Sequence, residues 1–238
     1  MGDAAPRVTV VVPTYNERPN LEELAGRVLA LGPAYALLVV DDGSPDGTGA
    51  LADALAAANP GRISVLHRRR KEGIGPAYVA GFGRALATGT PLVAQMDADL
   101  SHDPADLPRL VAAAEDADLV IGSRYAAGGG TAGWSAWRRW LSRAGCIYAR
   151  AVLGVEVADL TGGFKVWRRE TLATSDLGRI AADGYGFQIE TTVRALRAGA
   201  RVVEVPITFR ERVAGRSKLS RRIVGEAALL VWKLRAEQ

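Results

Sequence analysis

Short apolar runs alternate with helical hydrophobic patterns through the first half of the chain. Leu21, Leu24 and Val28 recur at helical spacing after Pro19, and similar patterns follow each later apolar run. The runs predict five buried strands, which are Val8–Val12, Leu37–Val40, Ile63–Leu66, Leu92–Met96 and Leu119–Ile121. Strands that alternate with helices favour an α/β fold, a doubly wound, mainly parallel sheet with helices on both faces.

The alternation loosens after residue 123, where Gly128–Gly130 predicts a flexible connection. The remaining predicted elements are a helix over Trp134–Leu153, a strand over Phe164–Trp167, a helix over Phe187–Ala198, a strand over Val202–Val205 and a basic amphipathic helix over Ser217–Ala236. The chain has no internal repeat. We therefore expect one domain over residues 1–216, followed by a C-terminal basic amphipathic helix over residues 217–238.

Composition and charge narrow the class of protein. The 238 residues are 48% hydrophobic, which is enough for one large core. No segment reaches the roughly 18 uninterrupted apolar residues of a membrane span, and the N-terminus does not read as a secretion signal. The single cysteine, Cys146, suits a reducing compartment, so we expect a cytoplasmic protein. The net charge of +4 favours an anionic partner, but no recognition motif points to nucleic acid.

Two carboxylates follow the predicted strand Leu92–Met96. Asp97 and Asp99 lie on the same side of an extended chain because side chains alternate along it. The carboxyl end of a central strand faces the ligand crevice of an open α/β sheet. Two like charges repel each other there unless a cation, such as a hard divalent ion bridging to a diphosphate, compensates them. Taken alone, an Asp-x-Asp sequence is more often a turn cap, and only the neighbouring strand ends favour a site.

Polar and aromatic side chains also follow the first two predicted strands. Pro13–Glu17 follows the first strand, and Asp41 and Asp42 follow the second. Carboxylates at these positions can accept hydrogen bonds from a base, and Tyr15 can stack on its ring. A plain Asx-rich turn remains the alternative for Asp41–Asp46 alone. Three such strand ends in one sheet favour a nucleotide site.

A dinucleotide-dependent oxidoreductase is not expected. Gly81–Leu86 starts like the GxGxxG fingerprint, but it lacks the third glycine and lies within a helical pattern. The first strand also leads into Pro13–Tyr15, which is not a glycine-rich turn.

Three further features each have two interpretations. His102 follows the carboxylates and is interpreted as a loop residue rather than a general base. Arg68–Lys71 is a basic run, for which a solvated loop is the default and phosphate attraction the alternative. Trp134, Trp137 and Trp140 recur at every third residue, which is typical either of a core stripe or of a membrane interface.

Six segments occur in a characteristic order over residues 8–219. They are Pro13–Glu17, Asp41–Thr48, Met96–Pro104, Gly122–Tyr125, Asp159–Lys165 and Glu204–Pro206. Together they resemble dolichol-phosphate (polyprenol-phosphate) mannose synthases, which are inverting glycosyltransferases of GT-A fold. The first and third segments indicate only a GT-A glycosyltransferase, and those from Gly122 onward narrow the resemblance to transfer onto a lipid phosphate.

The resemblance implies an activity. It is the transfer of mannose from GDP-mannose to a polyprenyl (dolichyl-type) monophosphate with inversion, giving a β-linked product and GDP. The acceptor oxygen is already anionic at neutral pH, so such a reaction needs positioning and charge compensation more than a general base. A polyprenyl-phosphate glucosyltransferase that uses UDP-glucose is the alternative.

The resemblance also implies roles on the donor side. The expected guanosine-binding residues are Pro13, Tyr15, Glu17, Val40 and Asp42. Asp97 and Ala98 are expected to approach the sugar nucleotide. Arg212 and Lys218 match basic residues that close on the donor diphosphate. Apart from the resemblance, Gly215 within the polar stretch Val213–Lys218 leads us to expect a mobile lid there.

A metal site and an acceptor site are implied in the same way. Asp99 matches the carboxylate that binds Mg²⁺ or Mn²⁺. Ser101 stands where some relatives carry glutamine as a second ligand, and because a hydroxyl is a poorer ligand, the metal preference stays open. Arg124 and Arg138, with Ser142 nearby, match residues that hold the acceptor phosphate. The expected catalytic residues are thus Asp97, Asp99, Arg124 and Arg212.

We expect peripheral binding to the cytoplasmic face of a membrane, because a polyprenyl acceptor is too apolar to leave the bilayer. The candidate contacts are the Trp134–Trp140 stripe and the C-terminal helix. The apolar and basic residues of that helix are Leu219, Ile223, Leu230 and Leu234, with Lys218, Arg221, Arg222 and Lys233. A small membrane-spanning protein is a further partner that the resemblance allows.

Overall fold

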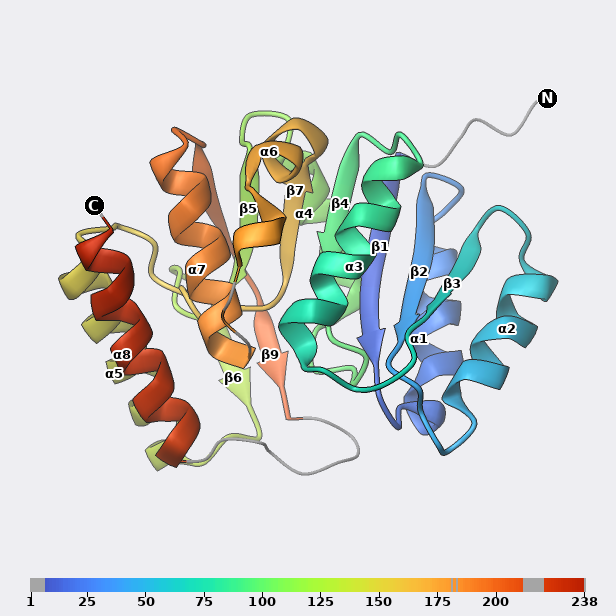
Figure 1. Ribbon diagram of the computed structural model, residues 1–238, viewed down its shortest axis with the longest axis horizontal. Helices are drawn as coiled ribbons and strands as arrows, with labels where there is room; N and C mark the ends of the chain where they lie inside the picture. The colour runs from blue at the N-terminus through green and yellow to red at the C-terminus, as the bar shows by residue number, and fades with distance from the viewer. Residues whose placement is uncertain (1–6, 181, 183, 212–220, 238) are drawn as a thin grey trace.

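The structure, a computed structural model, describes residues 7–180, 182, 184–211 and 221–237, without the side chains of 179, 185 and 221–228. Its strands are β1 (Val8–Thr14), β2 (Tyr35–Asp41), β3 (Ile63–His67), β4 (Leu92–Gln95), β5 (Leu119–Ser123), β6 (Gly130–Ala132), β7 (Lys165–Arg168), β8 (Val202–Pro206) and β9 (Thr208–Arg210). Within the described ranges, seven strands form one sheet in the order β3-β2-β1-β4-β7-β5-β8, and β6 pairs with β9 (Figure 1).

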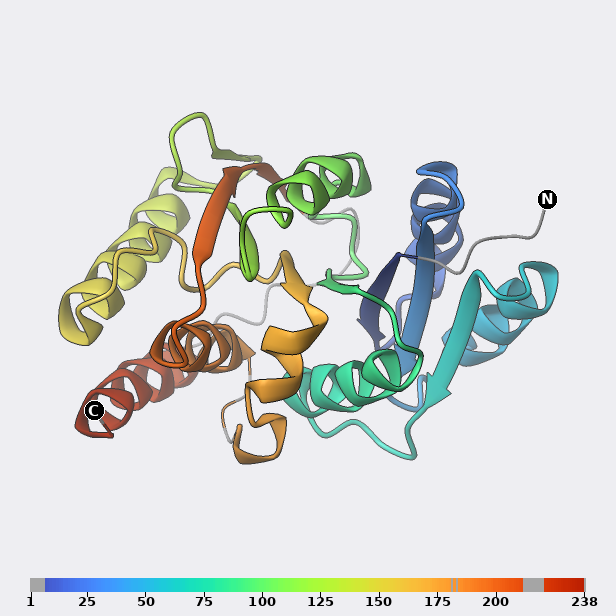
Figure 2. The same ribbon diagram turned by 90° about the horizontal axis from the view of Figure 1, so that it is seen from above.

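Helices cover both faces of the main sheet (Figure 2). They are α1 (Arg18–Ala30), α2 (Thr48–Ala58), α3 (Ile74–Ala87), α4 (Leu107–Ala113), α5 (Ala136–Leu153), α6 (Arg169–Thr174), α7 (Gly184–Arg197) and α8 (Arg221–Ala236). Short 3-10 helices span Pro104–Asp106 and Leu177–Arg179. The predicted α/β fold with a doubly wound, mainly parallel sheet is confirmed.

Two hydrophobic clusters, one on each face of the sheet, form the core. In β1, Val10 and Val12 pack in the cluster with α1 and α4, whereas Val11 packs with α3 and α7 on the opposite face. This is the period-two alternation of a strand that is buried on both faces. Each fully buried valine or leucine contributes about 1.5–3 kcal/mol relative to an exposed one.

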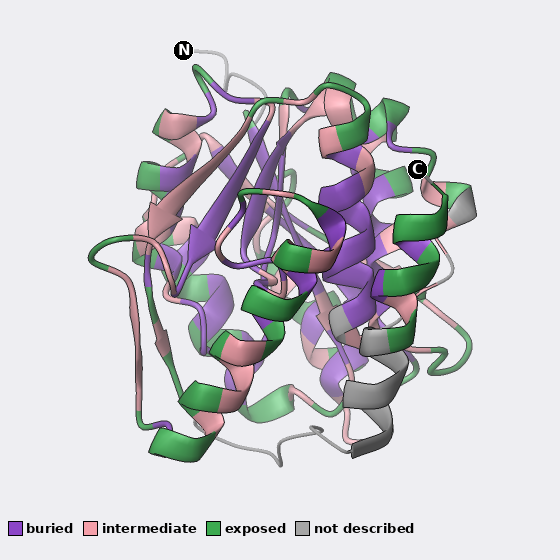
Figure 3. Ribbon diagram, turned by 90° about the vertical axis from the view of Figure 1, so that its left-hand side faces the viewer, coloured by how far each residue is buried: buried purple, intermediate pink, exposed green. Residues whose placement is uncertain are grey.

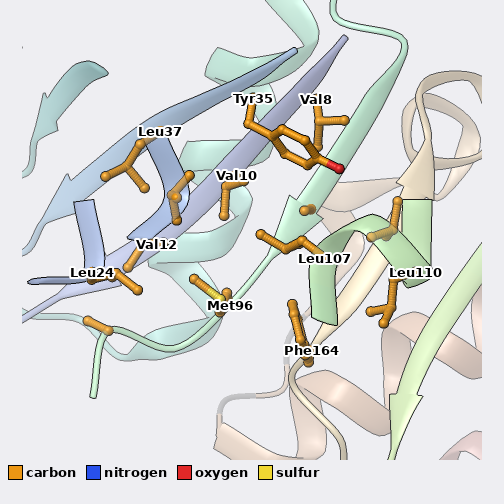
Figure 4. Close-up of a cluster of buried hydrophobic side chains, with 14 of the residues drawn as sticks. Val8, Val10, Val12, Leu24, Tyr35, Leu37, Met96, Leu107, Leu110 and Phe164 are labelled. Carbon is orange, nitrogen blue, oxygen red and sulfur yellow. The ribbon is translucent and has the colours of Figure 1, made fainter. Parts of the chain in front are cut away.

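The first cluster also anchors the segment that follows β4. Met96 is fully buried and lies with Leu107 of α4 and with Phe164 in this cluster (Figure 4). Because Met96 directly precedes Asp97, its burial anchors the backbone at the start of the segment that carries Asp97 and Asp99. The apolar run therefore holds the polar strand end in place.

The direction of β7 and the strand β6 were not predicted. β7 runs antiparallel to both β4 and β5, and it places Lys165 opposite both Gln95 and Ile121. A run of four residues does not encode strand direction, so the sequence could not supply this. Gly130 was assigned to a flexible connection, but it starts β6 and its N–H donates to the carbonyl of Ile207 at 2.9 Å, so that assignment is wrong for Gly130.

For Trp134 the core interpretation is confirmed, and the expectation that this residue contacts a membrane is wrong. Trp134 precedes α5, because the hydroxyl of Ser135 caps the helix N-terminus by accepting a backbone N–H at 3.3 Å. At the other end Gly154, with φ 68°, terminates α5 in the left-handed conformation. Trp134 is therefore 6% exposed, whereas Trp137 and Trp140 on the helix are 66% and 60% exposed.

The C-terminal helix packs against the rest of the protein. α8 lies beside α5 and α7 (Figure 1), and its Val231 and Leu234 are each 1% exposed in the second hydrophobic cluster. The expectation that Leu234 faces a membrane is therefore wrong, because α8 uses this stripe to bury core surface. Leu219 lies outside the described residues, and the side chain of Ile223 is not described.

Candidate active site

A cavity of about 340 Å³ opens where β1, β2 and β4 end. β1 and β2 end in register, with Thr14 opposite Asp41, and β4 runs parallel to β1. Parallel strands bring their carboxyl ends to one edge, so residues far apart in the chain meet there. The predicted site residues that line the cavity are Pro13, Tyr15, Glu17, Asp42, Asp97, Ala98, Asp99, Arg124 and Arg138.

The other predicted site residues are placed differently. Val40 does not line the cavity, because strand alternation turns its side chain into the hydrophobic cluster with α3, and its place in the guanosine-binding set stays a prediction. Ser101 is fully buried and does not line the cavity. Ser142 does not line the cavity either. Arg212 and Lys218, with the lid expected over Val213–Lys218, lie outside the described residues.

The basic run Arg68–Lys71 supports the nucleotide end of the cavity. The ammonium of Lys71 lies 3.9 Å from the centre of the Tyr15 ring, and Lys71 itself lines the cavity. Arg68 forms an ion pair with the carboxylate of Asp42, and both side chains are largely buried. Burial raises the pKa of Asp42, and the contact with Arg68 opposes that rise. The default interpretation of this run as a solvated loop is therefore wrong for Arg68, whereas Lys71 is exposed in a loop and also lines the cavity.

Asp97 is held by its neighbours in the cavity wall. The hydroxyl of Tyr78 donates to Asp97 Oδ1 at 3.3 Å, and the N–H of Asp97 donates to His102 Nδ1 at 3.2 Å. His102 is 2% exposed and stacks on Phe164, and burial lowers its pKa. An imidazole that accepts at Nδ1 is neutral, so His102 orients the Asp97 segment, which agrees with its interpretation as a loop residue.

The next carboxylate, that of Asp99, lies in a tight turn with Ser101. Asp99 Oδ1 accepts the N–H of Ser101 at 3.1 Å, and Leu100 between them has a positive φ of 60°. The hydroxyl of Ser101 is buried and has no hydrogen-bond partner among the described residues. A buried oxygen without a partner beside a carboxylate suits a hard divalent cation. The described residues hold no cluster of three or more His, Cys, Asp or Glu side chains for a metal, so substrate oxygens and water would have to complete such a site.

A buried ion pair supports another part of the cavity wall, where Arg124 lines the cavity. The guanidinium of Arg124 donates to Asp159 from Nε at 2.7 Å and from Nη2 at 2.6 Å, and Nη2 also donates to Thr161. The side chains of Arg124 and Asp159 are 5% and 0% exposed. Burial opposes the ionisation of Asp159, but the charge and hydrogen bonds of Arg124 outweigh it and lower the pKa of Asp159. Glu204 holds this segment in turn by accepting the N–H groups of Ala158 and Asp159.

Arg138 reaches the same wall from α5. Its guanidinium lies 4.1 Å from the Trp134 ring centre and 3.0 Å from Glu211. Ser142, one turn further along α5, accepts a hydrogen bond from the hydroxyl of Tyr125 at 2.7 Å. The cavity thus combines a ring-stacking end, a pair of carboxylates and an end with two guanidinium groups.

The sequence analysis did not assign several of the cavity residues to the site. Lys71 carried a signal, since it ends the basic run, and Gly163 lies in a segment that had been singled out. Gln188 and Phe209 carried none, because each lies within an ordinary helix or strand pattern. Tertiary folding alone brings them to the cavity.

The family model of "Glycosyl transferase family 2" matches residues 9–174, and the chain belongs to that family. The chain is 49% identical over 232 residues to an undecaprenyl-phosphate mannosyltransferase of Micrococcus luteus, covering 97% of this chain and 95% of that one. It is 50% identical over 233 residues to a polyprenol monophosphomannose synthase of Mycolicibacterium smegmatis, covering 96% and 88%. The resemblance to polyprenol-phosphate mannose synthases is therefore confirmed.

Solved structures share the fold. Glucosyl-3-phosphoglycerate synthase of Mycobacterium tuberculosis, in complex with Mn²⁺, UDP and phosphoglyceric acid, superposes with a TM-score of 0.69 at 23% identity. The match covers 98% of this chain and 80% of that one. At this identity the match supports the GT-A fold and nothing finer.

Proposed function

We propose that the protein transfers mannose from GDP-mannose to a polyprenyl monophosphate with inversion, giving polyprenyl-phosphate β-mannose and GDP. The observation that carries this proposal is the single cavity that joins Tyr15 and Asp42, the carboxylates Asp97 and Asp99, and the guanidinium of Arg124. The two relatives at about half identity, both named for mannose transfer to a polyprenol phosphate, support the choice of substrates.

The donor nucleotide is proposed to lie at the end of the cavity formed by β1 and β2. The base stacks on Tyr15, whose ring also contacts the Lys71 ammonium. Pro13 and Glu17 complete this wall, and Asp42 accepts hydrogen bonds from the guanine amino and imino groups. Arg212 and Lys218 are proposed to compensate the diphosphate charge.

Asp99 and the hydroxyl of Ser101 are proposed to hold a divalent cation, either Mg²⁺ or Mn²⁺. Bound there, the cation supplies charge compensation for the leaving diphosphate. Asp97, with the backbone of Ala98, then lies against the sugar part of the donor.

The acceptor phosphate is proposed to lie between Arg124 and Arg138. Its anionic oxygen attacks C1 of the mannose from the side opposite the diphosphate, while the bond from C1 to the diphosphate oxygen breaks and GDP leaves. No proton has to be removed from the phosphate, so the residues supply position and charge rather than a base. Ser142 supports this end through Tyr125.

A transfer assay with a panel of GDP- and UDP-sugars and a polyprenyl monophosphate tests the proposal. We expect product only or mainly from GDP-mannose, and activity in the presence of Mg²⁺ or Mn²⁺. Preferential use of UDP-glucose would instead support the glucosyltransferase alternative.

We further propose that the exposed apolar face of α5 and α8 lies on the membrane surface. Its large hydrophobic residues are Trp137, Trp140, Ile147, Tyr148, Leu229 and Trp232, and much of α5 is exposed in Figure 3. Trp137 and Trp140 stack with their ring centres 5.0 Å apart, and Arg138 between them points to the cavity. Within the described residues no helix is long and apolar enough to cross a membrane. A small membrane-spanning partner is a further proposal for recruitment.

Replacing Trp137 and Trp140 together by serine is expected to weaken binding to anionic vesicles by at least about tenfold, because each tryptophan buries a large apolar area in the lipid headgroup region. Vesicle sedimentation at low and high salt measures this. A double variant at Ala57 and Ala58, which are exposed on α2 at the other end of the molecule, is the serine control. Equal vesicle binding by the two double variants would contradict the proposed membrane face.

A further inference from the structure

Three buried side chains form a hydrogen-bonded relay that ends at the cavity. The indole N–H of Trp167 donates to Gln95 Oε1 at 3.1 Å, and Gln95 Nε2 donates to Gln188 Oε1 at 2.8 Å. Trp167 and Gln95 are fully buried, and Gln188, which lines the cavity, is 5% exposed. The relay connects β7, β4 and α7 across the core.

The chemistry of the relay fixes which way each amide points. An indole N–H can only donate, so Gln95 must present its oxygen to Trp167. Its NH₂ group therefore faces Gln188, which must present oxygen in turn. Turning either amide over would place two donors or two acceptors against each other in a buried site, which is costly. Gln188 therefore uses its side-chain oxygen within the relay, and its NH₂ group is the donor at the cavity end of the relay.

The NH₂ group of Gln188 borders a space that a glycine keeps open. A Cβ atom added to Gly163 would lie 3.3 Å from Gln188 Nε2 and 3.7 Å from Asp97 Oδ1. Both residues line the cavity. A hydrogen-bond donor and a carboxylate acceptor therefore border the same small space, together with the ring of His102 at 3.6 Å from that Cβ.

The backbone of Gln188 is fixed as well. Its carbonyl oxygen accepts hydrogen bonds from Lys165 Nζ at 2.8 Å and from the hydroxyls of Thr191 and Thr192 at 3.2 and 3.0 Å. Burial lowers the pKa of Lys165 to about 7. A side chain fixed at both ends loses little further freedom when it binds a ligand.

We infer that Gln188 binds the donor sugar by donating a hydrogen bond from its NH₂ group to one hydroxyl of the hexose, and that Trp167 and Gln95 are positioning residues for it. A sugar hydroxyl both donates and accepts, so it suits a space bordered by this NH₂ group and by Asp97. A site built to hydrogen-bond a hydroxyl rejects an analogue that lacks it. The inference rests on the proposed function and names a determinant of sugar selectivity within it.

The test is a thermodynamic cycle in which the sugar hydroxyl and the Gln188 amide are removed separately and together. Wild-type protein and Gln188→Leu are assayed with GDP-mannose and with its 2-, 3-, 4- and 6-deoxy analogues, and affinity for GDP is measured alongside. We expect one deoxy donor to lose about tenfold in kcat/KM with the wild type, and Gln188→Leu to lose about the same with GDP-mannose. That deoxy donor should lose nothing further with Gln188→Leu, and affinity for GDP should stay unchanged.

Two further variants separate positioning from stability. Trp167→Phe keeps Gln188 but removes the donor that fixes the relay, so KM for GDP-mannose should rise while affinity for GDP stays constant. Val193→Ala, on the same helix and 1% exposed, removes buried volume from the cluster that also contains Trp167 but removes no hydrogen-bonding group of the relay, so it is the matched control. Val193→Ala should lower thermal stability and leave the ranking of the deoxy donors unchanged.

Additive losses with every deoxy donor, or a weaker affinity for GDP in Gln188→Leu, would overturn the inference. Should Gln188→Leu fail to fold, an unchanged KM in Trp167→Phe would overturn it on its own. Either result, obtained with a wild type that transfers mannose, leaves the proposed function standing. A wild type that transfers nothing from GDP-mannose would instead remove the proposed function itself.

Discussion

Asp99→Asn is expected to lower kcat for mannose transfer by about 10²–10³-fold while the fold stays intact, a loss typical of removing one group that stabilises transition-state charge. The asparagine oxygen can still accept the N–H of Ser101, so the local turn survives. The amide carries no charge, however, and is a poor ligand for a hard cation. The measurement is kcat as a function of Mg²⁺ and Mn²⁺ concentration, together with calorimetric titration of Mn²⁺ in the presence of GDP.

Asp103→Asn is the matched control for this variant. Asp103 lies four residues away and caps the 3-10 helix Pro104–Asp106 by accepting the N–H of Ala105 at 3.0 Å, and it does not line the cavity. Its replacement should leave metal binding and transfer unchanged. Full activity of Asp99→Asn, or of the wild type in excess chelator, would show that Asp99 does not hold a catalytic metal.

The second large effect is expected at the buried pair of Arg124 and Asp159. Asp159→Ala should lower the free energy of unfolding by about 3–5 kcal/mol, because it leaves the Arg124 guanidinium buried without its partner. For a protein of this size the melting temperature should fall by roughly 6–20 °C. Arg124→Ala should be similarly destabilising, since it leaves the Asp159 carboxylate uncompensated. Calorimetric or denaturant unfolding measures both.

A double variant separates the structural role of this pair from its proposed role with the acceptor. Arg124→Leu with Asp159→Leu removes both buried charges, so it should recover most of the stability that either single change loses. It should not recover use of the polyprenyl phosphate, because the guanidinium is still absent. Recovery of transfer by the double variant would mean that Arg124 only supports the fold.

Arg138→Ala is expected to weaken acceptor binding with little loss of stability, in contrast to the variants of Arg124 and Asp159. Its partner Glu211 is 51% exposed at the side chain, so losing this ion pair should change stability by less than about 1 kcal/mol. KM for the polyprenyl phosphate should nevertheless rise, with affinity for GDP-mannose nearly constant. A loss mainly in affinity for GDP-mannose would contradict this role and indicate that Arg138 binds the donor instead of the acceptor phosphate.

The sheet could be predicted because buried parallel strands are continuous apolar runs. Val8–Val12 and Leu37–Val40 lie within β1 and β2, and the predicted alternation of strands and helices is observed. The antiparallel direction of β7 could not be predicted, because a run such as Phe164–Trp167 looks the same in either direction. Trp134 was misplaced for a related reason, since the spacing of three tryptophans does not show that a serine cap starts the helix after the first.

The cavity was predictable where strand ends carry its chemistry. Tyr15, Asp42 and Asp97 follow β1, β2 and β4, so the period and topology of the sheet bring them together. The long-range contacts that support the cavity were not predictable. The pairing of Asp42 with Arg68 joins a strand end to a loop 26 residues further along the chain, and the relay to Gln188 spans 93 residues from Gln95. Such pairs depend on packing of the whole core rather than on local pattern.

The most direct test of the account is the structure of the product formed by the purified wild-type protein. Polyprenyl phosphate in anionic vesicles, GDP-mannose and Mg²⁺ or Mn²⁺ are incubated with the protein, and the lipid product is analysed by mass spectrometry and NMR. The account predicts one hexose per polyprenyl phosphate, identified as mannose in β linkage, with one GDP released for each. An α-linked mannose, or a product formed from UDP-glucose but not from GDP-mannose, would contradict it.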